Sequence, residues 1–223
     1  MSGLDAVMST SEQQIFGISV VVVGQFNPAI FHPQWLAIEG LIRPDEAKTA
    51  KLNFVHDEIA EFTLAAPESG SLNIQVTRER LTAATEDARR YEVMRDLVAG
   101  VLGVLRHTPV NKLGINVDAH VAKETDAMHA VGHRLAPKEP WSGLLESPGL
   151  AQLVMRGARP DGLRGHIMVT VGPSVRIKPG VVVAINDHFE TDEADTSGTD
   201  PIQEILTKHW GPSIERSRGI ISA

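Results

Sequence analysis

The sequence predicts a single α+β domain, residues 15–223, with one antiparallel sheet and two long helices on one face. The first observation is that predicted elements follow the order β-α-β-β-β-α over residues 15–107 and again over 113–214. The second is apolar–polar alternation in the strand segments, and the third is an apolar stripe of helical spacing late in each half. We therefore expect two halves related by a pseudo-twofold axis, similar in element order but not in residue identity, and a sheet of about eight strands.

The first half opens with a strand. Residues 1–14 are polar and are expected to form a flexible tail. The strand Ile18–Phe26 carries β-branched residues on both faces, and Asn27-Pro28 ends it. Short helices are predicted to begin at Pro33 and Pro44, because proline suits the first helical turn. Three strands follow at Leu52–His56, Glu61–Ala65 and Ser71–Arg80, with Pro67-Glu68-Ser69-Gly70 as the turn before the last.

A long helix is predicted to close this half. Its apolar stripe is Tyr91, Met94, Leu97, Val98, Val101, Leu102 and Leu105. Gly100 and Gly103 thin one flank of the stripe. Each glycine costs about 0.5–1 kcal/mol relative to alanine, so either a neighbouring segment approaches closely or packing holds a slightly weak helix.

The second half repeats this order. A strand with one apolar face runs over Leu113–Val121, and a short helix follows from Thr125 to Pro137. Strands are expected at Gly149–Ala158, Arg164–Val171 and Val181–Glu190, with the turn Arg159-Pro160-Asp161-Gly162 between the first two. After the acidic connection Glu190–Asp200, a capping box of Asp200 and Gln203 starts the last helix. Gly211-Pro212 is expected to stop or bend it.

Composition restricts the classes of function. The chain has 223 residues, 42% hydrophobic and 22% charged, with a net charge of −7. This balance weighs against nucleic-acid binding, which favours a surplus of Lys and Arg. With no cysteine, thiolate metal sites and thiol nucleophiles are excluded. The N-terminus lacks the basic start and apolar core of a signal peptide, so we expect a cytoplasmic, non-membrane protein without a cofactor.

One candidate metal site lies on the short helix of the second half. Asp126, His129 and His133 occupy positions i, i+3 and i+7 and so share one helical stripe. Helical zinc sites use histidines four residues apart because this spacing aims both rings at one point. The alternative is that both histidines are solvated on an exposed helix face.

Alternating polar residues suggest a second candidate site on one face of the sheet. The proposed ligand-binding residues are Asn116, Asp118, His120, Asn186 and His188. An acidic residue near a histidine orients it for proton transfer or ligand binding. The alternative is an antiparallel sheet with one face in water.

Self-association or a protein partner is the third expectation. A sheet built from two open halves leaves edge strands, and exposed edges invite pairing. Ile18–Val23 is apolar on both faces and carries no charge, so we expect it to need cover on both sides. The segment after Gly211-Pro212 is expected to dock on a neighbour, and the alternative is that it folds back within the same chain. The proposed interface residues are Trp210, Ile214, Ile220 and Ile221.

Short motifs resemble a broad group of uncharacterised bacterial proteins of this size. The motifs are Phe26-Asn27-Pro28, His107-Thr108-Pro109-Val110-Asn111-Lys112-Leu113-Gly114-Ile115-Asn116 and Ile185-Asn186-Asp187-His188. The resemblance covers residues 15–190 and implies a soluble, often operon-encoded bacterial protein, with no catalytic residue to carry over. We predict a non-enzymatic binding or assembly module, working as an oligomer or as a subunit of a multi-protein system. The alternative is a small-molecule-binding protein or a cryptic hydrolase that uses the polar sheet face.

Overall fold

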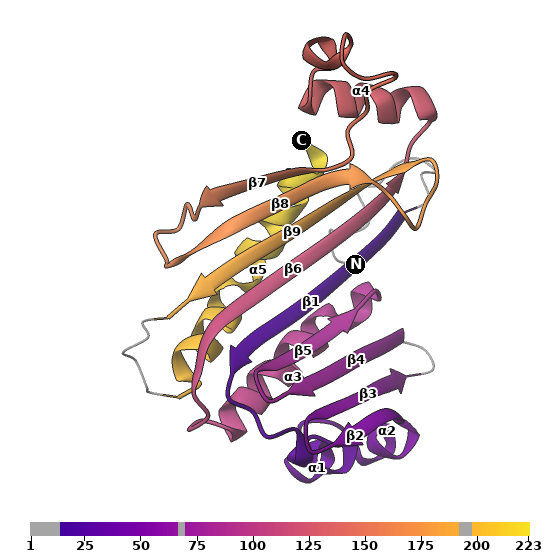
Figure 1. Cartoon of the computed structure of the whole chain (residues 1–223). Helices are drawn as coiled ribbons and strands as arrows, with labels where there is room; N and C mark the ends of the chain where they lie inside the picture. Colours follow the sequence, from indigo (N-terminus) through magenta and orange to yellow (C-terminus); the bar gives the residue numbers. More distant parts are fainter. Residues whose placement is uncertain (1–13, 67–69, 192–197) are drawn as a thin grey trace, which may run out of the picture.

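The protein is built on one antiparallel sheet of nine strands, in the order β2-β3-β4-β5-β1-β6-β9-β8-β7 (Figure 1). The computed structural model describes residues 14–66, 70–191 and 198–223. The strands are β1 (Gln14–Gly24), β2 (Lys51–His56), β3 (Ile59–Ala66), β4 (Gly70–Thr77), β5 (Arg80–Thr85), β6 (Val110–Ala122), β7 (Leu153–Ala158), β8 (Gly165–Pro173) and β9 (Gly180–Glu190). The α-helices are α1 (Pro33–Ile38), α2 (Pro44–Thr49), α3 (Tyr91–Val104), α4 (Thr125–Leu135) and α5 (Asp200–Ser222).

The α+β class and the single antiparallel sheet agree with the sequence prediction. Parts of the predicted tail, of the predicted turn before Ser71 and of the acidic connection lie outside the described residues, at 1–13, 67–69 and 192–197. The expected tail therefore falls there except for Gln14, which begins β1.

The sheet has one strand more than the number expected. The segment predicted as the single strand Ser71–Arg80 turns after Thr77 and returns as β5, which pairs with both β4 and β1. Leu81, Ala83 and Thr85 alternate inward along β5. The small Ala83 and the polar Thr85 weaken the strand signal in the sequence, although both side chains are buried.

Strand β1 lies in the interior of the sheet, between β5 and β6. Its backbone groups are therefore paired with strands of this chain on both sides. Val20 and Val22 are fully buried against the helices. The edges of the sheet are β2 and β7.

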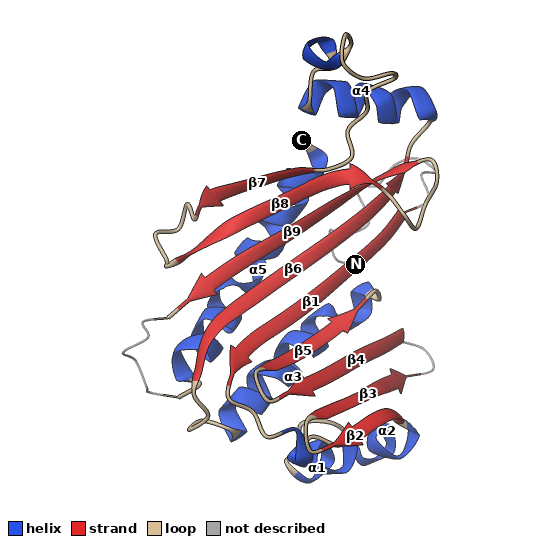
Figure 2. Cartoon of the chain, in the orientation of Figure 1, coloured by secondary structure: helices blue, strands red, loops and turns tan. Residues whose placement is uncertain are grey.

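Helices α3 and α5 lie on the same face of the sheet and pack against each other (Figure 2). Hydrogen bonds join the two helices. At the start of α5, Thr199 Oγ1 donates to Leu102 O at 2.7 Å, and Gln203 Nε2 donates to Ala99 O at 2.7 Å. Further along α5, Trp210 Nε1 donates to Glu92 Oε1 at 3.0 Å. The predicted capping box is thus wrong, because Gln203 bonds to the neighbouring helix and Thr199 is the N-cap.

Gly100 and Gly103 leave space for neighbouring segments to approach α3 closely, which is the first of the two predicted alternatives. A Cβ on Gly100 would lie 2.6 Å from Leu41 Cδ2, and one on Gly103 would lie 3.0 Å from Gln203 Nε2. The missing side chains therefore allow Leu41 and Gln203 to pack against α3.

Helix α5 continues through Gly211-Pro212 to Ser222, so of the two predicted outcomes, a stop or a bend, the stop is wrong. Proline removes one backbone hydrogen bond of the helix, but Ser213, Ile214 and Ser217 beyond it are buried. Packing against the sheet therefore holds the second part of α5 in place. None of the described helices is both long and apolar enough to span a membrane.

Candidate functional site: the face of the sheet opposite the helices

A row of polar side chains crosses the centre of the sheet on the face opposite α3 and α5. Asn116 on β6 lies directly across from Ser19 on β1 and from Asn186 on β9. Asn116 Nδ2 donates to Ser19 Oγ at 3.2 Å, and Asn186 Nδ2 donates to Asn116 Oδ1 at 2.6 Å. The neighbouring Ile115 and Ile185 point into the core on the other face, as strand alternation requires. This row brings together two of the predicted binding residues.

The other predicted binding residues lie in different rows of the same face. Asp118 lies across from Ala184, His120 from Val182, and His188 from Gly114. Rows on one face are two residues apart, about 7 Å, so His120 and His188 are separated by about 20 Å along the strands. The five residues therefore share a face but do not form one site.

His120 contacts the turn between β8 and β9. Its Nδ1 lies 2.8 Å from Ser174 Oγ, and both residues are buried. Ser174 Oγ also accepts hydrogen bonds from Arg176 N at 3.2 Å and Ile177 N at 3.0 Å. With two amides donating to the oxygen, the hydroxyl hydrogen is available for His120, and the serine holds the turn closed. Burial raises the pKa of Asp118, two residues before His120.

A denser cluster lies at the other end of β9, where His166, His188 and Glu190 meet. His166 and His188 face each other across β8 and β9 with ring centroids 4.7 Å apart. His188 Nε2 lies 2.9 Å from Glu190 Oε1, and this hydrogen bond lowers the pKa of Glu190. Arg156 Nη2 lies 3.3 Å from His166 Nδ1. Burial, followed by the charge of Arg156, lowers the pKa of His166.

The sequence prediction included His188 from this cluster but not His166 or Glu190. Glu190 was detectable, because it is two residues after His188 on a predicted strand and so shares its face. His166 lies on a different predicted strand, Arg164–Val171. Its place beside His188 depends on the register of β8 against β9, which the sequence does not state.

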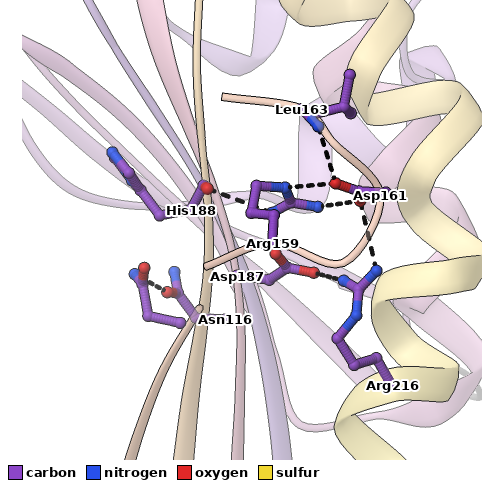
Figure 3. A network of polar contacts seen from close by, with 8 residues as sticks. Asn116, Arg159, Asp161, Leu163, Asp187, His188 and Arg216 are labelled. Atoms are coloured by element: carbon purple, nitrogen blue, oxygen red, sulfur yellow. Dashed lines mark hydrogen bonds and ion pairs between the residues drawn. The ribbon is translucent and has the colours of Figure 1, made fainter. Parts of the chain in front are cut away.

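Behind β9, on the helix side, two arginines and two aspartates form a closed network (Figure 3). Arg159, in the predicted turn after β7, donates to Asp187 and, at 2.6 Å, to Asp161. Arg216 on α5 donates to Asp187 as well and lies 3.4 Å from Asp161. His188 and Asn116 point to the opposite side of the sheet (Figure 3). The network joins the β7–β8 hairpin to α5, and no sequence prediction included it.

The helical residues proposed as metal ligands do not converge. Asp126, His129 and His133 are all exposed on α4. His133 Nε2 lies 3.4 Å from Glu139 Oε1. Within the described ranges, the group of three side chains whose ligand atoms all lie within 4.8 Å of one another is His166, His188 and Glu190.

The four proposed interface residues pack within this chain. Trp210 and Ile214 are buried in the core, with exposed fractions of 2% and 7%. Ile220 and Ile221 are partly buried against it. Because α5 continues past Pro212, the terminal segment folds onto its own sheet, which is the competing arrangement to docking on a neighbour.

No protein-family model and no curated protein matches this chain.

Proposed function

We propose that this protein is a binding and assembly module, without catalysis of its own, that joins a second copy through the edge strand β7. The observation that carries the proposal is the exposure of this edge. Every residue of β7 after Leu153 is exposed, and two of them are large and apolar: Val154 at 50% and Met155 at 60%.

Edge strands with unpaired backbone groups are templates for another strand, and they are usually blocked by charge, proline or a covering element. Strand β7 has one charged residue, Arg156, and no proline. Two identical edges brought together antiparallel around a twofold axis satisfy each other's backbone groups, and this symmetry is the commonest in soluble oligomers. A second copy is therefore the occupant that fits the edge best.

The contact between Ser174 and His120 also supports a binding role over a hydrolytic one. In a hydrolase the serine oxygen would face a substrate, whereas Ser174 Oγ is buried and accepts two backbone amides. The pair therefore closes a turn.

Sedimentation at micromolar concentration tests the assembly proposal. We expect a species of twice the 24.1 kDa chain mass, and we expect Met155→Lys to convert it to a monomer with unchanged circular dichroism. Leu52→Lys is the matched control, because Leu52 is 56% exposed on β2 at the opposite edge. A wild-type monomer, or dissociation by Leu52→Lys and not by Met155→Lys, would refute the proposal.

A second candidate function is the binding of a polar small molecule on the uncovered sheet face. The row Ser19–Asn116–Asn186 favours it, because its amides and hydroxyl are held in fixed orientation by neighbouring strands. Native mass measurement of the purified protein tests it. We expect an added mass that is lost in the Asn116→Leu variant; the bare chain mass in both proteins would count against this function.

We also propose that the two halves are copies of one duplicated unit. The element order supports this. Each half begins with a central strand, β1 or β6, and its last strand, β5 or β9, returns beside it before a long helix. Superposing residues 15–107 on 113–214 should match these strands and α3 with α5, leaving one strand of the first half unmatched. Failure of the two helices to overlay would exclude the duplication.

A further inference from the structure

We propose that His166, His188 and Glu190 form a binding site for one divalent transition metal ion of the Zn²⁺ class. This inference is independent of the assembly proposal, because the three residues lie on β8 and β9 and face away from the helices. The site is distinct from the helical set Asp126, His129 and His133, which the sequence suggested.

The backbone already places the three side chains at coordinating range. His166 and His188 are paired in register across two strands, and Glu190 follows two residues later on the same face of β9. Their ligand atoms all lie within 4.8 Å of one another. Tetrahedral zinc with bonds of about 2.0–2.2 Å places ligand atoms about 3.3–3.6 Å apart, so the three ligand atoms need to come closer by at most about 1.5 Å to bind one ion.

The donor set and the room beside it suit a zinc site with an open position. Two imidazoles and one carboxylate are the ligands of several catalytic zinc sites, where a fourth position is left for water or another ligand. Gly114 lies across from His188 on the next strand, β6. This position of β6 therefore places no side chain beside His188, and a Cβ there would be at ordinary contact distance from the side-chain amides of Asn186 and Asn116, at 3.5 and 3.6 Å.

In the present arrangement a hydrogen-bond contact joins His188 to Glu190, and the cation Arg156 contacts His166. His188 Nε2 lies 2.9 Å from Glu190 Oε1, a hydrogen-bond contact that coordination of both atoms to a metal ion would replace. Arg156 reaches His166 Nδ1 at 3.3 Å. This side chain is exposed and long, so it can move away when the ring binds a metal, but its charge opposes the ion.

The ligand types decide the kind of metal, and positive neighbours oppose its binding. Lys112 lies across from Glu190 on β6 and adds a second charge beside the site. With a single carboxylate and two imidazoles, the site offers too few oxygen ligands for Ca²⁺ or Mg²⁺, which prefer carboxylates, carbonyls and water. The nitrogen ligands favour Zn²⁺ or another late first-row ion.

Zn²⁺ titration of the full chain after dialysis against a chelator tests the site. We expect one equivalent to bind, and we expect His166→Ala, His188→Ala and Glu190→Gln each to weaken binding by about tenfold or more. Arg156→Gln should tighten it, because the opposing charge is removed. The matched control is His129→Ala/His133→Ala, which removes two exposed histidines and should leave binding unchanged.

Histidine NMR spectra of the wild-type protein make the test independent of whether the variants fold. Adding Zn²⁺ should shift the ring signals of His166 and His188 and leave those of His129 and His133 in place. Absence of stoichiometric binding, shifts at His129 and His133 instead, or loss of the bound ion in the control variant would each overturn the proposal.

Discussion

Arg159 and Asp187 form an ion pair behind strand β9 in which both side chains are almost completely removed from solvent, with exposed fractions of 0% and 1%. The guanidinium of Arg159 also stacks over the Phe189 ring, 3.5 Å from its centroid. Arg216 and Asp161 complete the network, so that two positive and two negative charges balance. The hairpin after β7 is attached to α5 by this balance.

Arg159→Ala should lower the free energy of unfolding by about 3–5 kcal/mol, because it leaves the buried carboxylate of Asp187 with one cation fewer. Chemical denaturation measures the change. Lys208→Ala is the control, since it removes an exposed pair with Glu204 on the same helix as Arg216. That loss should be at most about 0.5 kcal/mol. Equal effects of the two substitutions would show that the network does not hold the hairpin.

Tyr91 is the single tyrosine of the chain, so its titration can be observed by absorbance without overlap from another phenol. Burial, followed by the charge of Asp87, raises the pKa of Tyr91 to about 12. Its hydroxyl donates to Phe16 O at 3.2 Å. The folded state favours the neutral phenol, so its stabilising contribution is complete below the unfolded pKa of about 10 and is lost as the pH rises through the folded value.

Alkaline titration of the folded protein should therefore show ionisation well above that of the same chain in concentrated urea. The Tyr91→Phe variant should lose this part of the pH dependence of stability. An ionisation near pH 10 in the folded protein would mean that the ring is accessible to water.

Two glycines should respond to alanine in opposite directions. Gly219 lies within α5 and a Cβ there meets no atom of another segment within 4 Å, so Gly219→Ala should raise the free energy of unfolding by about 0.5–1 kcal/mol. Gly198 has a φ of +88°, and its Cβ would lie 1.8 Å from Arg106 O. Gly198→Ala should cost at least about 1–3 kcal/mol. Thermal unfolding of the two variants beside wild type checks both signs.

Ser174→Ala should destabilise the protein by about 1–3 kcal/mol, because the amides of Arg176 and Ile177 lose their acceptor inside the structure. Ser222→Ala, which removes an exposed hydroxyl that bonds to Arg218 O, is the control and should change stability by less than about 0.5 kcal/mol. If Ser174→Ala is as stable as wild type, the serine does not hold the turn and the hydrolase alternative gains support.

The local patterns of the sequence were sufficient for most of the fold. Apolar alternation identified the strand that is β6, and the 3/4 spacing of Met94, Leu97, Val98 and Val101 identified α3. These elements are encoded by neighbours in the chain, because each buries one face whose period matches its own geometry. The face shared by Asn116, Asp118 and His120 followed from the same alternation.

Tertiary structure alone decided the contacts between segments that are distant in the sequence. Pro212 is a local signal for ending a helix, and the burial of Ile214 against the sheet outweighs it. His166 meets His188, and Arg159 meets Asp187, through strand register and through a hairpin placed behind β9. Local spacing determines which face a residue occupies, whereas the residue it meets across that face depends on which strands pair and in which register. This is why most of the fold could be predicted from the sequence and the site could not.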